Sequence, residues 1–119
     1  MNRFLVVVFA AVVLLFSGSP LAYADAPTKL TGEVIDTYCY AAMGAKGESH
    51  RECGIKCAKK GIPVGLLEDG TNKIYVLLPN KDDTALSDDV INKMGKKATV
   101  TGHAYASGGS QFFSVDSVS

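Results

Sequence analysis

Three cysteines and one histidine in the first half of this 119-residue sequence carry the types and spacing that could do chemistry. Cys39 precedes the segment SHRECGIKCAKKG, which places His50, Cys53 and Cys57 at spacings of three and four residues. Thiolates and an imidazole are ligands that Zn(II) and Cu(I) prefer, and four of them complete a tetrahedral site. The spacing therefore predicts a site for one ion, Cu(I) or Zn(II), made of Cys39, His50, Cys53 and Cys57.

A helix from about His50 to Lys60 is expected to hold most of this set. Ser49 followed three residues later by Glu52 matches a capping box at the helix start. Gly61 supplies a left-handed residue after the last turn, and Pro63 cannot continue the helix. At about 100° per residue, the histidine and both cysteines of this helix fall within an arc of about 60° and share one face.

Two further residues are candidates for weaker roles at the site. The segment Leu30 to Cys39 alternates like a strand and would end at the first cysteine, with Asp36 turned toward the interior. Asp36 would either orient His50 from the second shell or cap a backbone N–H of the following loop. Met43 would either add a thioether that favours Cu(I) or fill the core.

Two other interpretations of the cysteines stay open. A disulfide from Cys39 to Cys53 or Cys57 would leave one free thiol, whereas a disulfide between the two helical cysteines would be strained. Thiol redox catalysis would use Cys53 beside His50 near a helix N-terminus, where the pKa of a thiol is lowered. The sequence has no C-x-x-C pair and no thioredoxin-like pattern, so a binding role is preferred over an enzymatic one.

The remaining elements define the expected fold. After the cysteine helix come a hairpin, VGLLED-GTN-KIYVLLP, a short helix, SDDVINKMG, and two strands, KKATVTGHAYA and QFFSVDSV. This order predicts a mainly β (α+β), five-stranded OB-like barrel. The cysteine-bearing helix is inserted between strands 1 and 2, and a second short helix lies between strands 3 and 4. By fold analogy, OB-folds commonly bind ligands at the loop that carries this insertion.

The N-terminal 24 residues have the pattern of a signal peptide. Arg3, an apolar run from Phe4 to Phe16 and the small residues of Ala22-Tyr23-Ala24 precede an expected mature domain of residues 25–119. No second apolar run predicts a membrane span in the mature chain, so we expect a periplasmic or secreted protein. Its balanced charge, zero for the full chain, argues against nucleic-acid binding. The expected partner is a periplasmic or membrane metalloprotein.

The motifs GEVIDTYC, H-x-x-C-x-x-x-C and GIPVGLLEDG resemble those of a family of small exported bacterial proteins of largely unassigned function, predicted to bind metal in the periplasm. The resemblance extends from Leu30 to about Leu78. It has no assigned reaction to transfer, and it implies a metal-binding role for the motif. The motif residues in this sequence are Asp36, Cys39, His50, Cys53, Cys57, Gly61 and Pro63.

Overall fold

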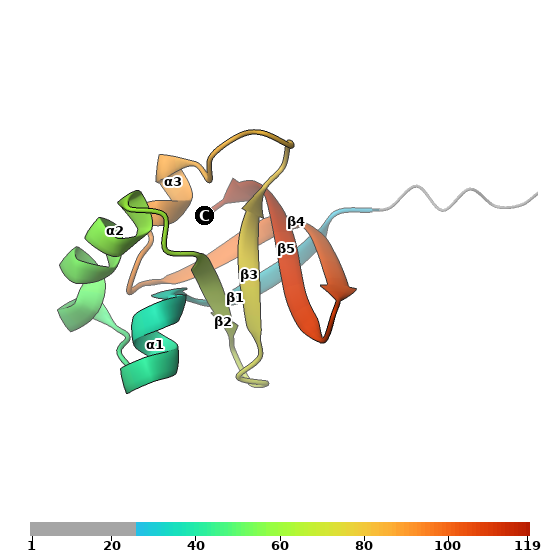
Figure 1. The fold of residues 1–119 in the computed structure, drawn as a ribbon. Coiled ribbons are helices and arrows are strands. Elements are labelled where there is room, and N and C mark those ends of the chain that lie inside the picture. The colour runs from blue at the N-terminus through green and yellow to red at the C-terminus, as the bar shows by residue number, and fades with distance from the viewer. Residues whose placement is uncertain (1–25) are drawn as a thin grey trace, which may run out of the picture.

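A closed five-stranded barrel forms the body of the protein (Figure 1). The computed structural model describes residues 26–119, and the expected signal peptide lies outside them. The barrel order is β1-β2-β3-β5-β4, with parallel pairing between β3 and β5 and antiparallel pairing elsewhere. The strands are β1 (Thr28–Asp36), β2 (Val64–Glu68), β3 (Ile74–Pro79), β4 (Lys97–Ser107) and β5 (Ser110–Val118). The predicted five-stranded barrel is confirmed.

Short helices fill two of the connections between strands. Between β1 and β2 lie α1 (Thr37–Met43), a 3-10 turn η1 (Glu48–His50) and α2 (Arg51–Lys59), and α3 (Asp88–Ile91) lies between β3 and β4. In Figure 1, α1 and α2 lie on the side of the barrel opposite the β4–β5 turn. Within residues 26–119, no helix is long and apolar enough to cross a membrane.

The first strand ends earlier than its alternating pattern predicts. Asp36 has extended backbone angles and serves as the N-cap of α1, because its side chain accepts hydrogen bonds from the N–H groups of Tyr38 and Cys39. The expected strand through Cys39 is therefore wrong at its end. Cys39 lies in a helix, and that helix ends at Gly44, whose φ of 66° is left-handed.

The cysteine helix has nearly the predicted bounds but begins differently. The chain enters α2 through η1, so His50 rather than Ser49 occupies the N-cap position, and no side chain caps the helix. The predicted capping box of Ser49 and Glu52 is therefore absent from this helix start. At the other end, Gly61 has a φ of 101°, which agrees with its predicted role as a helix stop.

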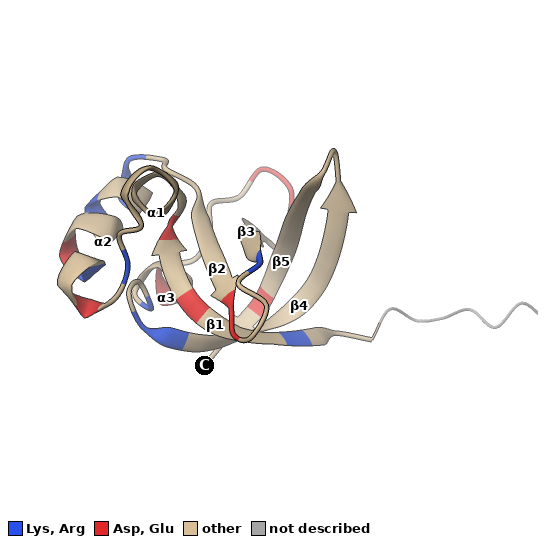
Figure 2. Ribbon diagram, turned by 90° about the horizontal axis from the view of Figure 1, so that it is seen from below, with Lys and Arg blue, Asp and Glu red and all other residues tan. Residues whose placement is uncertain are grey.

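The core is an apolar cluster, and one further buried residue among those described is charged. The cluster consists of Val34, Val64, Leu66, Leu77, Val90, Ile91, Met94, Ala98, Val100, Phe113 and Val115. Asp36 is the one charged residue buried within residues 26–119, at 1% exposure. Elsewhere, Figure 2 shows charges of both signs interspersed over α2 and the strands. A buried carboxylate is costly unless it is partnered, so Asp36 marks the place to look for a site.

Candidate metal centre

The two oxygens of the Asp36 carboxylate have different surroundings. Oδ1 accepts hydrogen bonds from the backbone N–H of Tyr38 at 3.0 Å and of Cys39 at 3.3 Å. Oδ2 is buried and has no hydrogen-bond partner among the described residues. It faces Nε2 of His50 at 3.5 Å, and that nitrogen is likewise buried without a partner there. Native proteins rarely leave such atoms unpaired, and those that are unpaired call for an explanation such as an ion.

Cys39 completes a compact group with these two residues. One ligand atom from each of Asp36, Cys39 and His50 lies within 4.8 Å of the other two. The cap of α1 places Cys39 one turn after the end of β1, at 7% exposure, and the start of α2 places His50 over the same spot. The structure thus assembles an oxygen, a sulfur and a nitrogen donor that could hold a metal ion.

The separation between Asp36 and His50 suits a shared ion better than a hydrogen bond. A separation of 3.5 Å between Oδ2 and Nε2 exceeds the usual length of a hydrogen bond. Nitrogen and oxygen ligands lie about 2.0–2.2 Å from Zn(II), so two of them in a tetrahedral site are about 3.3–3.6 Å apart. The observed separation falls in that range. Carboxylate, thiolate and imidazole are all accepted by Zn(II), so the donor chemistry also fits.

The start of α2 is anchored so that His50 keeps this place. The Arg51 guanidinium donates to the backbone carbonyls of Asn92 at 2.6 Å and Met94 at 2.8 Å, which ties α2 to the segment before β4. The backbone N–H of Gly47 donates to Glu33 of β1 at 3.0 Å. His50 lies between these two anchors, so the histidine is positioned by β1 and by the approach to β4.

The other two predicted ligands lie on α2 at different depths. The partly buried Cys57 has its thiol near the Asp36 carboxylate and interacts with Cys53, whereas Cys53 itself is exposed. All three cysteines lie in the described part of the chain, and none forms a disulfide there. Of the four predicted ligands, Cys39 and His50 therefore belong to the compact group, whereas Cys57 lies outside it on the side of Asp36 and Cys53 is exposed on α2.

The thiols and the carboxylate shift one another's pKa. Burial acts to raise the pKa of Asp36, but interactions with the Cys39 and Cys57 thiols, the Cys39 N–H and His50 outweigh it and lower that pKa. The Asp36 carboxylate, followed by burial, raises the pKa of Cys39 to about 11 and also raises the pKa of Cys57. Redox catalysis needs a lowered thiol pKa, so neither of these two cysteines suits that interpretation.

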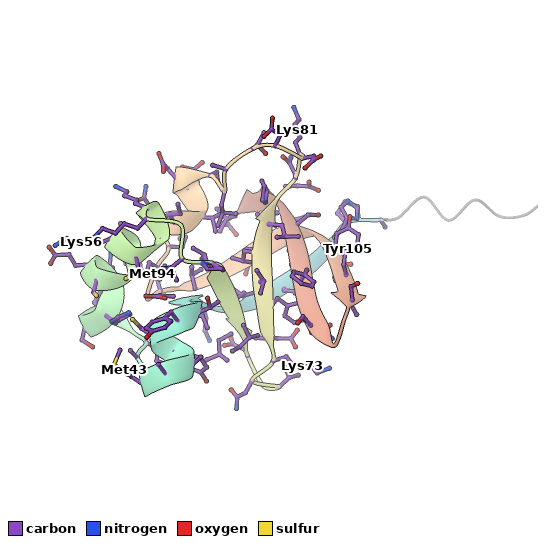
Figure 3. All side chains as sticks on the ribbon, viewed as in Figure 1. Met43, Lys56, Lys73, Lys81, Met94 and Tyr105 are labelled. Atoms are coloured by element: carbon purple, nitrogen blue, oxygen red, sulfur yellow. The ribbon has the colours of Figure 1, made fainter. Side chains whose placement is uncertain are left out.

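The structure points to a methionine that the sequence reasoning missed. Met43 is 68% exposed on α1, so its interpretation as core filler is wrong. Met94 is buried against Gly54 of α2 (Figure 3). A Cβ on Gly54 would lie 2.9 Å from the Met94 sulfur and 3.5 Å from His50 Cδ2. A glycine inside a predicted helix is the sequence signal of such a close approach.

The second histidine takes no part in this group. His103 lies on β4, and its Nε2 is 3.7 Å from an Asp116 oxygen on β5, with both side chains partly exposed. His103 therefore offers a natural control for experiments on His50.

Comparisons with known proteins add no relative to this description. No protein-family model matches the chain, and no curated protein or solved structure is similar to it.

Proposed function

We propose that this chain is a metal-binding protein that holds one Cu(I) or Zn(II) ion outside the cytoplasm and hands it to a partner metalloprotein. One observation carries the proposal: the buried Asp36 Oδ2 and His50 Nε2 face each other unpaired at 3.5 Å. A third donor, the buried thiol of Cys39, belongs to the same compact group. A cation between these donors would satisfy both orphaned atoms at once.

The proposed ligands are Cys39, His50 and Cys57, with the Asp36 carboxylate at the fourth position. Cys57 is included because its thiol interacts with Asp36. Cys53, the remaining member of the four predicted ligands, is exposed on α2. An oxygen donor favours Zn(II), whereas a site of thiolates and imidazole alone also suits Cu(I). When bound, the ion would bridge the first strand and the two inserted helices.

The proposed location and partner rest on the sequence. The signal-peptide pattern of the first 24 residues supports export, and the resemblance to exported metal-binding proteins supports the role. A domain of about 95 residues with a small site, and no second cluster of this kind within residues 26–119, is suited to binding an ion rather than to multistep chemistry. A metalloprotein in the same compartment would be the recipient.

The first experiment is elemental analysis of residues 25–119, purified without chelator, together with a count of free thiols. Wild type and the control His103→Ala should each hold about one ion per chain, because His103 lies outside the group. Cys39→Ser and His50→Ala should lose the ion. A wild-type chain with no metal, two oxidised cysteines and one titratable thiol would refute the proposal in favour of a disulfide-stapled barrel.

A further inference from the structure

The three cysteines differ in exposure in a way that a closed, purely structural site does not require. Cys39 is buried at 7% exposure, Cys57 is partly buried and Cys53 is exposed. Cys53 and Cys57 lie four residues apart on α2, so their side chains are neighbours on one face of the helix, and Cys39 belongs to the compact group with Asp36 and His50. The sulfur atoms thus form a short series from solvent to the buried, unpaired Asp36 Oδ2.

We infer that Cys53 is the exchange ligand of this centre, through which the ion passes between the buried site and a partner that presents thiolates. This inference rests on the proposed function and assigns its partner chemistry. Cys53 is one helical turn from Cys57, so the two sulfur atoms can hold the same ion in succession. A partner cannot reach Cys39 directly, because that side chain is buried between α1 and the barrel.

Each exchange step replaces one bond of the ion by another. On entry, a bond to Cys53 would form as the bond to a first partner thiolate breaks, and a bond to Cys57 would form as the bond to a second partner thiolate breaks. The bond to Cys53 would then break as a bond to Cys39 forms, and His50 Nε2 would displace a water bound to the ion. The ion keeps its oxidation state throughout, and the proton of each thiol that becomes a ligand is released to solvent. On exit, the same steps run in reverse.

A resident ligand stays bonded to the stored ion, whereas an exchange ligand bonds to it only during transfer. Substitution of the first should weaken binding, and substitution of the second should slow transfer. Cys53→Ser removes an exposed sulfur at little structural risk, because the side chain is in solvent. We expect it to slow transfer of Zn(II) to dihydrolipoic acid, a small dithiol, at least tenfold while changing the equilibrium affinity for Zn(II) less than threefold. Lys56→Ala, which removes an exposed charge on the same helix, is the matched control and should transfer at the wild-type rate.

Alkylation gives a second readout that does not depend on transfer rates. In the Zn(II)-loaded chain, Cys53 should remain open to iodoacetamide while Cys39 and Cys57 are protected, as mass spectrometry of the digested protein would report. Protection of Cys53 together with a loss of affinity in Cys53→Ser would overturn the inference, because it would make Cys53 a resident ligand. Wild-type transfer by Cys53→Ser would also overturn it.

The two proposals fail in distinguishable ways. If wild type binds no Zn(II), or if Cys39→Ser binds it as tightly as wild type, the proposed function is wrong. If Cys39→Ser loses Zn(II) but Cys53→Ser shows no separation of rate from affinity, the metal centre stands and the exchange role of Cys53 is wrong.

Discussion

Asp36 uses its two carboxylate oxygens for different purposes, so two substitutions can separate them. Oδ1 caps α1 by accepting from two N–H groups, at 3.0 and 3.3 Å. An asparagine caps a helix about as well as an aspartate, so Asp36→Asn should keep the unfolding free energy of the metal-free chain within about 0.5 kcal/mol. Asp36→Ala loses the cap, at a cost of about 1 kcal/mol, which lowers the Tm by about 4–8 °C.

The other oxygen determines what the same variants do to metal binding. In Asp36→Asn, the amide NH2 must replace Oδ2, because the oxygen is needed for the two N–H donors of α1. An NH2 group cannot accept or ligate a cation beside His50. Loss of a ligand or of its orienting carboxylate costs about 10–100-fold in metal affinity, so both variants should bind Zn(II) that much more weakly.

Two assays on the same samples test this separation. Thermal unfolding of the metal-free chains, followed by circular dichroism, measures the cap, and competition with a chromophoric chelator measures Zn(II) affinity. Equal affinity in wild type and Asp36→Asn would refute the reasoning, since it would leave Asp36 as a helix cap alone. A large loss of stability in Asp36→Asn would show that Oδ2 supports the fold itself.

Three further predictions concern packing and protonation in the metal-free chain. Gly54→Ala should destabilise the fold, because its Cβ would lie 2.7 Å from Met94 Cγ in a buried position. Overpacking of about 1–3 kcal/mol exceeds the helix propensity gain of about 1 kcal/mol. Adding Met94→Ala should remove that penalty in a double-mutant cycle of denaturant unfolding, with exposed Lys56→Ala as the control. The thiol of Cys39 should titrate near pH 11 in the 13C NMR spectrum of cysteine-labelled protein. The midpoint should move toward the ordinary value of 9.0 in Asp36→Asn, and an unchanged midpoint would show that Asp36 is not the main cause of the raised pKa. Because the folded pKa of Asp36 is below its ordinary 3.8, its stabilising contribution is present above pH 3.8 and is lost as the pH falls through the lower folded pKa. The unfolding free energy of wild type should therefore drop more steeply below about pH 4 than that of Asp36→Asn, and parallel curves would contradict this.

The barrel could be predicted from the sequence because its signals are local. Alternating apolar residues identify the strands, and Gly61, which has a positive φ, directly follows the end of α2. The order of elements then limits the topology. None of these signals depends on contacts between residues that are far apart in the sequence.

The predicted end of β1 was wrong because one residue satisfies two local patterns. Asp36 continues the alternation of β1, but it is also a favourable N-cap residue, and in the structure it begins α1. The candidate ligands were found by type and spacing, yet their different depths were not. Met94 lies 40 residues from Gly54, and only the packing of α2 against the barrel brings its sulfur against that glycine. Contacts of this kind leave no periodic pattern in the sequence from which they could be predicted.

The position of Asp36 is hard to explain by stability alone. An exposed residue could cap α1 equally well, and filling the end of the barrel with an apolar side chain would avoid leaving a buried oxygen unpaired. An unsatisfied buried polar group costs about 1–3 kcal/mol, and Asp36 Oδ2 and His50 Nε2 are two such atoms in contact range. Proteins depart from favourable packing in this way chiefly at functional sites. A cation held between these atoms and the Cys39 thiol would give both unpaired atoms a partner. Relief of their unsatisfied burial would then add to the free energy of cation binding.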